Sequence, residues 1–371
     1  MKIKKIVAMS AAVGVALTGL AFVSSASAEP VSNSYVLVGS DTLQDSTNAL
    51  INGTTASGAT VRVTANGGTL GSFDAFGSAA IQTKSNGPYF ARPNGSGAGV
   101  TALRASVDGT RTYSVAGNAT PPKTISGQVD IARSSSGPGT NANADGKLLY
   151  VPYARDAVGY AYKGGNAAWA TLTPAQLKEI FDGTLTSVGG LPIHPRLPQT
   201  SSGTRSFFLG ALGYTGSPLS APGVSDVNNV TAENDATVLL DGEIIPFSAA
   251  SWIAQANGVT GTNSTTAANV AFGSPVSGQA AFTGTVPALV PNSGFYSNTT
   301  FGRDTYLVVE YARVKTSDPK YDAALAALVD STKAGSLTNF GTLPNTPGAV
   351  KKKFGFLAPA STVAIPAYVT N

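Results

Sequence analysis

Residues 35–52, YVLVGSDTLQDSTNALIN, decide the fold class, because a strand pattern and a helix pattern follow each other there without a gap. The apolar, β-branched run 35–38 is typical of a buried strand, and 39–42 is predicted to be a tight turn. Apolar positions and one threonine then recur at helical spacing before Gly53, namely Leu43, Thr47, Leu50 and Ile51. The first unit is therefore predicted to be strand, turn, helix.

The same alternation continues along the chain. Further strands are predicted at 60–63, 129–132, 148–162 and 306–311, and further helices at 171–183, from Thr204 onward and at 321–329. A short helix is also predicted to open at 94–99. This order favours an α/β protein over an all-β sandwich. The tracts 213–233 and 257–269 are predicted to be surface insertions.

The segment 171–183 carries the clearest helix pattern. Thr173 is a predicted N-cap, Pro174 takes the first helical position, and Gln176 completes a capping box. Gly183 is the predicted stop.

The amino-terminal 28 residues are predicted to be a secretory signal peptide. Lysines precede an apolar run at 6–23, which ends in Ala26-Ser27-Ala28, and cleavage is expected after Ala28. Loss of Lys2, Lys4 and Lys5 lowers the formal net charge from +4 to +1. No second long apolar run follows, so we expect a secreted or cell-envelope protein that does not insert into the membrane after cleavage.

Composition excludes several classes of function. Only 12% of residues are charged, and the one basic run after the signal is 351–353, so neither nucleic acid nor an anionic membrane surface is an expected partner. The chain has no cysteine and a single histidine, His194, predicted to lie in a loop. Disulfides, thiolate catalysis and multi-histidine metal centres are therefore not expected, and no cofactor is implied. The remaining length of about 340 residues predicts two domains.

Four segments share one chemical character, a turn of glycine and hydroxyl residues beside a predicted helix start or strand end. They are Gly39-Ser40-Asp41-Thr42, Gly95-Ser96-Gly97, Arg133-Ser134-Ser135 and Ser202-Gly203-Thr204-Arg205. A helix start offers unpaired N–H groups and partial positive charge, and glycine admits close approach. Several such ends brought together would bind an anion.

Each segment alone also has an ordinary interpretation. Ser40, Ser96 and Thr204 could be plain helix N-caps. Arg133 and Arg205 could form structural salt bridges, although a guanidinium also matches oxyanion geometry.

The sequences of these segments and their order along the chain resemble those of the phosphate-binding subunits of phosphate ABC transporters, within the type II periplasmic-binding-protein superfamily. The likeness covers most of the chain after the signal. Its most specific parts are 172–181, LTPAQLKEIF, and 202–208, SGTRSFF, and it also rests on 130–134, DIARS.

This resemblance implies a two-lobed, venus-flytrap α/β fold with a mixed sheet in each lobe and crossing hinge strands. The signal peptide would be 1–28, lobe one 29–155 and 303–371, and lobe two 156–302, with the chain leaving lobe one near Asp156 and returning near Arg303. It implies a monomer that delivers its ligand to ABC permease subunits, and not an enzyme.

The resemblance also implies the ligand-binding residues. By motif these are Ser40, Thr42, Ser96, Ser202, Gly203 and Thr204, joined by Arg205, which follows the Ser-Gly-Thr element. The family's third loop often supplies an aspartate that accepts the proton of monohydrogen phosphate. Here the matching position is Arg133 or Ser134, so Asp41 is predicted either to replace that acceptor or to cap the helix that follows. The arginine usually found just before the Ser-Gly-Thr element has no clear counterpart, because Arg196 lies six positions earlier.

We therefore expect capture of a small oxyanion, foremost inorganic phosphate, and keep three alternatives open. The ligand could be sulfate, molybdate or tungstate. The chain could be a secreted hydrolase, although it lacks a Gly-x-Ser-x-Gly elbow. It could also be a surface adhesive protein, given its Thr, Ser, Asn and Gly content.

Overall fold

The structure, a computed structural model, describes residues 30–215 and 231–367. The predicted signal peptide and most of the tract 213–233 lie outside the described residues.

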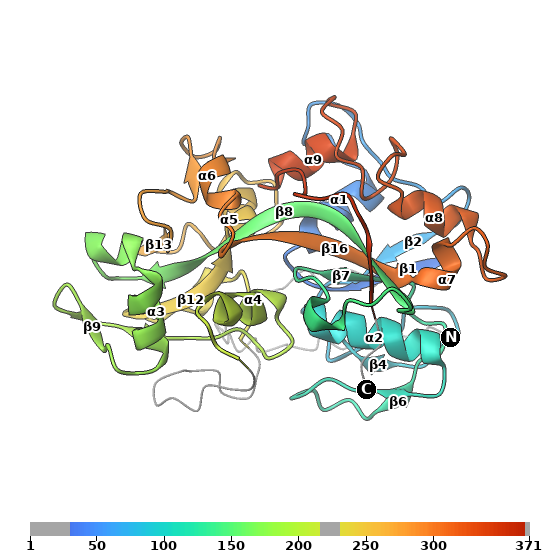
Figure 1. Cartoon of the computed structure of the whole chain (residues 1–371), viewed down its shortest axis with the longest axis horizontal. Helices are drawn as coiled ribbons and strands as arrows, with labels where there is room; N and C mark the ends of the chain where they lie inside the picture. The colour runs from blue at the N-terminus through green and yellow to red at the C-terminus, as the bar shows by residue number, and fades with distance from the viewer. Residues whose placement is uncertain (1–29, 216–230, 368–371) are drawn as a thin grey trace, which may run out of the picture.

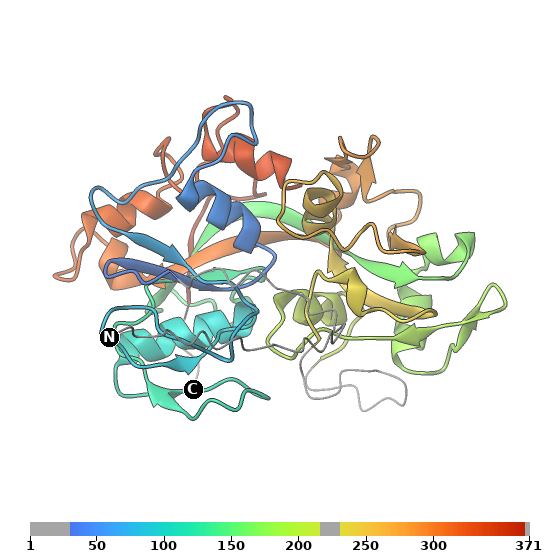
Figure 2. The same cartoon turned by 180° about the vertical axis from the view of Figure 1, so that it is seen from behind.

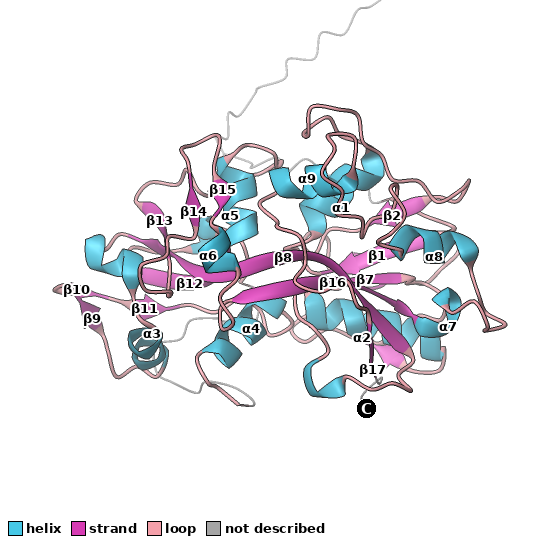
Figure 3. Ribbon diagram, turned by 45° about the horizontal axis from the view of Figure 1, so that its top comes forward, coloured by secondary structure: helices cyan, strands magenta, loops and turns pink. Residues whose placement is uncertain are grey.

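Two long antiparallel strands connect two lobes (Figure 1). They are β8 (Leu148–Lys163) and β16 (Gly302–Glu310), paired from Gly302 opposite Ala157 to Glu310 opposite Leu148. Figure 3 shows them side by side across the molecule. The predicted two-lobed α/β fold with crossing strands is confirmed. Asp156 and Arg303, where the chain was expected to change lobes, are direct partners in this ladder. The lobe boundaries themselves stay a prediction.

The sheet of lobe one is mixed. Its strand order is β2, β1, β7, β16, β8, with β17 also on β8, and β1 runs parallel to β2 and β7 whereas β16 is antiparallel to β7. The added strands are β1 (Tyr35–Gly39), β2 (Leu70–Ser72), β7 (Ile131–Ser134) and β17 (Ile365–Ala367).

Successive side chains of these strands enter two different cores, as the period of two in a strand requires. Tyr35 and Leu37 pack in one hydrophobic cluster, and Val36 and Val38 in another on the opposite face. The helices of this lobe are α1 (Gln44–Asn52), α2 (Ser96–Asp108), α7 (Tyr311–Val314), α8 (Ala323–Val329) and α9 (Pro347–Lys353). Its small elements are the pairs β3 (Ala80–Ile81) with β4 (Phe90–Ala91) and β5 (Thr112–Tyr113) with β6 (Lys123–Thr124), and the short helix η1 (Gly139–Asn141).

Lobe two surrounds the far half of β8, seen from behind in Figure 2. β12 (Glu243–Ser248) and β13 (Val270–Gly273) pair antiparallel with β8, and β11 (His194–Pro195) pairs in parallel with β12. The single histidine, expected in a loop, thus lies exposed in β11.

One hydrophobic cluster fills lobe two, built around Trp169, Phe181, Phe208 and Phe247. Its helices are α3 (Pro174–Phe181), α4 (Gly203–Ala211), α5 (Ala249–Ala256) and α6 (Ser293–Tyr296), with the short helices η2 (Ala167–Thr171) and η4 (Ala236–Val238). Two further pairs join β9 (Ser187–Val188) with β10 (Leu191–Pro192), and β14 (Phe282–Thr283) with β15 (Val290–Pro291).

The helix α3 forms as its sequence predicts. The Thr173 side chain accepts a hydrogen bond from the Gln176 N–H, and the Gln176 side chain accepts one from the Thr173 N–H. Leu177, Ile180 and Phe181 are its buried face. The capping box is therefore confirmed.

The strand predicted at 60–63 is wrong. Val61 makes only an isolated bridge to Thr54, and the strand next to β1 is β2 instead. Val61 and Val63 are buried, but the Val63 N–H bonds to the Leu50 carbonyl at the end of α1. Burial against a helix, rather than against the sheet, explains this apolar pattern.

Within 30–215 and 231–367, no helix is both long enough and apolar enough to cross a membrane.

Candidate ligand-binding site

The lobe-one part of the site lies where β1 and β7 end. These strands are parallel neighbours, so their carboxyl ends meet at one edge of the sheet, the usual place for ligands in α/β folds. Ser40 and Thr42 follow β1 and are buried, and Ser135 follows β7 and is also buried. Gly39 turns the chain at φ 111°, where a Cβ would lie 2.6 Å from the Arg133 carbonyl oxygen, so the turn requires glycine.

The amino end of α2 meets this edge. Ser96 Oγ accepts a hydrogen bond from the Ser135 N–H at 2.9 Å and lies 3.1 Å from Ser135 Oγ. The helix comes close because a Cβ on Gly99 would lie only 2.6 Å from Gly39 Cα. Gly39 and Gly99, which lack side chains, therefore allow the start of α2 to lie against the turn that follows β1.

Lobe two contributes the amino end of α4. Ser202 is its N-cap, and the Ser202 Oγ accepts a hydrogen bond from the Arg205 N–H at 3.0 Å. Ser202, Gly203 and Thr204 are all buried, which places this helix start inside the molecule.

Loops of the two lobes are directly hydrogen-bonded beside these helix ends. The Gly97 N–H donates to the Ser201 carbonyl at 3.0 Å, and Ser201 Oγ donates to Asn94 Oδ1 at 2.6 Å. The Gln199 side chain also donates to the Asn94 carbonyl. The starts of α2 and α4 thus meet from opposite lobes, and the region between them, around Ser40, Ser96 and Thr204, is called the interlobe cleft.

Hydroxyl groups and one arginine line the same cleft. Thr42 Oγ1 of lobe one lies 3.4 Å from Thr204 Oγ1 of lobe two. Arg303 Nη2 donates to Thr204 Oγ1 at 2.9 Å, and the same guanidinium binds Asp156 through Nε at 3.1 Å and Nη2 at 2.9 Å. Arg303 is 4% exposed, and its Nη1 has no hydrogen-bond partner among the described residues.

Two carboxyl groups lie at the edge of this cleft. Asp41 Oδ1 accepts a hydrogen bond from Asn234 Nδ2 at 3.1 Å, and Asn234 Nδ2 also lies 3.1 Å from Thr42 Oγ1. Burial raises the pKa of the Asp41 carboxyl well above its usual range, and the neighbouring Glu233 carboxyl raises this pKa further. No side chain caps α1, whose N-cap is Leu43, so Asp41 does not act as the helix cap.

The structure therefore gathers most of the predicted residues at one cleft. Those from 40–42, Ser96 and 202–204 lie there, whereas Arg133, Ser134 and Arg205 bond to backbone around it. Arg133 donates to the carbonyls of Ser40 and Phe73 and to Ser72 Oγ. Ser134 Oγ donates to the Ser136 carbonyl, and Arg205 to the Pro198 carbonyl. Arg133 and Arg205 thus hold the loops that carry the other groups.

Burial lowers the pKa of Arg133 to about 10, although nearby carboxylates act against this decrease. This arginine remains a cation at neutral pH and is satisfied by carbonyl oxygens rather than by an acid.

Several residues of the cleft are not predicted by any motif in the sequence. Ser135 is adjacent to a predicted residue, but Glu233, Asn234 and Arg303 stand outside every motif that the sequence shows. Thr204 and Arg303 are 99 positions apart, and only the fold joins them.

A cavity of about 390 Å³ adjoins the cleft between α1 and α5. Four carboxylates line it, Asp41, Asp45, Glu233 and Asp235, together with amide side chains that include Asn234 and Gln255. No group of three or more acidic or histidine side chains suited to a metal ion occurs in the described part of the chain.

Asp45, which lines this cavity, is expected to make the stability of the protein depend on pH. Burial, followed by the nearby Asp74, raises the pKa of Asp45 to about 6. Because ionisation is then harder in the folded chain than in the unfolded one, Asp45 lowers stability above pH 6 and has no effect below about pH 4. We expect Asp45→Asn to raise the free energy of unfolding by about 1–2 kcal/mol at pH 7.5 and not at pH 4.

Urea unfolding at the two pH values measures this difference. Asp108→Asn is the opposite control, because hydrogen bonds from Thr110 lower the pKa of Asp108, and its replacement should not stabilise the protein at pH 7.5. An equal gain from Asp45→Asn at both pH values would contradict the prediction.

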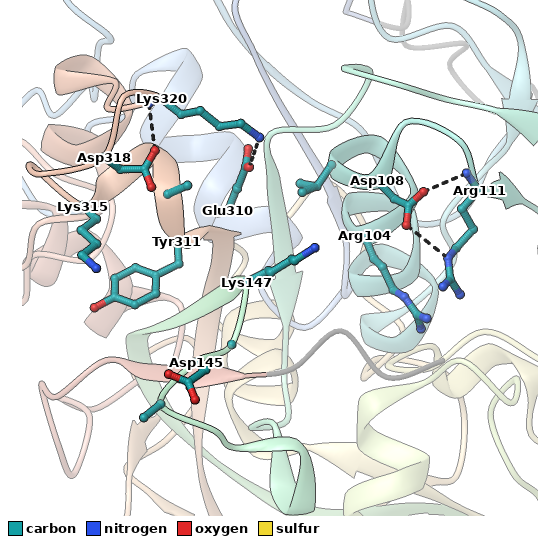
Figure 4. Close-up of a pocket in the computed structure, with 14 residues that line it drawn as sticks. Arg104, Asp108, Arg111, Asp145, Lys147, Glu310, Tyr311, Lys315, Asp318 and Lys320 are labelled. Carbon is teal, nitrogen blue, oxygen red and sulfur yellow. Dashed lines mark hydrogen bonds and ion pairs between the residues drawn. The ribbon is translucent and has the colours of Figure 1, made fainter.

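A larger cavity, about 760 Å³, lies at the other end of lobe one, where α2 ends and β8 begins (Figure 4). Its charges include internal pairs, Lys320 with Glu310 at 2.7 Å and Arg111 with Asp108 at 3.9 Å. It shares no residue with the cleft described above. We therefore do not assign the predicted ligand to it.

The described chain is thus a two-lobed α/β protein in which the starts of α2 and α4 meet between the lobes. The sequence matches the family described as PBP superfamily domain over residues 25–323, which is most of the chain. The chain belongs to this superfamily.

Comparisons of structures give distant similarities. An ABC-type phosphate transport receptor from Vibrio cholerae has 16% sequence identity and a TM-score of 0.48, with 88% of this chain and 100% of that chain covered. PstS from Borrelia burgdorferi has 15% identity and a TM-score of 0.41, with 88% and 99% covered. No curated protein matches the sequence significantly.

Proposed function

We propose that this protein captures a small oxyanion, foremost inorganic phosphate, in the cleft between its lobes and releases it chemically unchanged. The observation that carries the proposal is a pair of buried polar atoms, Arg303 Nη1 and Ser40 Oγ, that have no hydrogen-bond partner in the described chain. Buried polar groups in proteins are nearly always satisfied, so unpaired ones beside a cleft indicate a ligand.

The surrounding charges suit an anion of small size. The helices α2 and α4 both start at the cleft, and each start presents N–H donors and partial positive charge. Arg303, whose guanidinium contacts Thr204 in the cleft, is already paired with Asp156. Binding would therefore rest mainly on hydrogen bonds from hydroxyl and backbone groups, with a guanidinium edge that matches oxyanion geometry.

Asp41 is the proposed source of selectivity between phosphate and sulfate. An ionised carboxylate accepts a hydrogen bond from the proton of monohydrogen phosphate but repels fully ionised sulfate. Because burial and Glu233 raise the pKa of Asp41, the effect is expected at alkaline pH, where this carboxyl is ionised. There we expect Asp41→Asn to reduce the ratio of phosphate affinity to sulfate affinity roughly tenfold, because an amide does not repel sulfate. Competition binding of the two ions to wild type and variant measures the ratio, and an unchanged ratio would remove Asp41 from the site.

Transport is the biological role that we infer from this chemistry. A ligand held between two lobes stabilises their closed arrangement, and closure is a signal that a membrane permease can recognise. We accordingly propose export of the protein by means of the predicted signal peptide and delivery of the oxyanion to ABC permease subunits.

The function is tested by thermal shift of the wild-type protein with phosphate, sulfate, molybdate and tungstate. A ligand present at 100 times its Kd should add about 2.7 kcal/mol of stability. We expect phosphate to give the largest shift. Release of product from a chromogenic phosphate ester would instead favour a hydrolase, and no shift with any of the four ions would refute oxyanion binding.

A further inference from the structure

Glu233 places a carboxylate at the amino end of α4. It lies just before η4 and is 2% exposed. Its Oε2 accepts hydrogen bonds from Ser202 Oγ and from the Thr204 N–H, the latter at 3.4 Å, and its Oε1 has no partner in the described residues. Glu233 therefore already accepts hydrogen bonds from two donors at the start of α4.

These are the same donors that the proposed function gives to the oxyanion. A serine hydroxyl has one proton to donate, so Ser202 Oγ cannot donate to Glu233 and to a ligand together. Two negative groups at one helix end in a buried cleft would also repel each other strongly. Glu233 and an oxyanion thus compete for α4.

We propose that Glu233 is an internal competitor that an oxyanion must displace from the amino end of α4, so that this residue sets the affinity of the site. The inference rests on the proposed function and adds a residue that limits it. The cavity of about 390 Å³ that Glu233 lines provides space for the displaced side chain.

The neighbouring residue connects this exchange to the contact between the lobes. Asn234 donates to Asp41 Oδ1 in lobe one, and its own Oδ1 accepts from the Ser248 N–H in lobe two at 3.0 Å. It also holds a left-handed backbone conformation, at φ 57°. A shift of Glu233 therefore acts directly on a residue that bridges the lobes.

Calorimetric titration with phosphate and with sulfate tests the proposal on wild type, Glu233→Gln and Glu233→Ala. Glutamine keeps the shape but not the charge, and alanine removes the competitor. The matched control is Asp235→Asn, which makes the same charge change two residues away in the same cavity and keeps the acceptor for the Thr237 N–H. We expect both Glu233 variants to bind both ions roughly tenfold more tightly than wild type, with the ratio between the ions unchanged.

Each other outcome is decisive. Unchanged or weaker binding in both Glu233 variants, with wild type binding phosphate, would overturn this inference and leave the proposed function standing. A changed phosphate to sulfate ratio would make Glu233 a ligand contact and not a competitor. A gain of the same size in Asp235→Asn would show a general charge effect and also overturn it. Failure of all four proteins to bind any oxyanion would refute the proposed function itself, whereas binding by the Glu233 variants alone would support both.

Discussion

Replacing Gly203 with alanine is expected to weaken oxyanion binding by roughly 2 kcal/mol, about 30-fold, without lowering the stability of the protein. A Cβ at this position would lie within 3.0 Å of Ser96 Oγ and of Ser135 Oγ, closer than real Cβ atoms approach such neighbours. Those serines belong to lobe one and Gly203 to lobe two, so the added methyl holds the lobes apart. Calorimetry gives the affinity, and small-angle scattering gives the separation of the lobes.

The same helix offers a matched control. Gly210 also lies in α4, but nothing approaches within 4 Å of a Cβ built there. Gly210→Ala should therefore leave affinity unchanged and raise stability by up to about 1 kcal/mol through helix propensity. Equal affinities for Gly203→Ala and Gly210→Ala would show that close contact at Gly203 is not needed for binding.

Replacing Arg303 with alanine is expected to cost about 3–5 kcal/mol of stability and to weaken oxyanion binding roughly 100-fold. The loss of stability follows because Asp156, which is fully buried, would keep its charge without its cationic partner. The loss of affinity follows because Arg303 orients Thr204 and has Nη1 available for the ligand. Urea unfolding and phosphate calorimetry measure the two effects separately.

Two further variants separate charge from geometry. Arg303→Lys keeps a cation for Asp156 and should recover much of the stability, but it lacks the planar fork and should still bind weakly. Arg155→Ala breaks a second ion pair between β8 and β16, with Asp304, which is partly exposed. Arg155 and Asp304 are the strand neighbours of Asp156 and Arg303, so their side chains point to the opposite face of the sheet. This substitution should cost less stability and no affinity. Normal phosphate affinity in Arg303→Ala would exclude Arg303 from the site.

Local patterns in the sequence predict local structure well in this protein. The capping box of Thr173 and Gln176 specifies α3 because its two hydrogen bonds lie within four residues. Likewise Ser202 predicts the start of α4, since its hydroxyl accepts a hydrogen bond from the N–H of Arg205, three positions later. The strand prediction for the apolar run at 60–63 is wrong because burial alone does not reveal whether these residues pack against a strand or a helix.

The rest of the cleft depends on contacts between distant positions. Arg303 meets Thr204 across 99 residues, and Glu233 meets Ser202 across 31. Arg133 is expected from its position beside serines to contact the ligand. In the structure its guanidinium instead donates hydrogen bonds to the carbonyls of Ser40 and Phe73. Only a three-dimensional arrangement decides which of two polar groups faces the ligand and which holds a loop.

The most direct measurement is a crystal structure of the protein with arsenate, a close analogue of phosphate whose anomalous scattering marks its position. The predicted result is one strong peak in the cleft, within hydrogen-bond distance of Arg303 Nη1 and of the amino end of α4, with Glu233 turned away into the adjoining cavity. A peak only at the far end of lobe one, or no peak at a concentration that saturates binding in solution, would contradict the account.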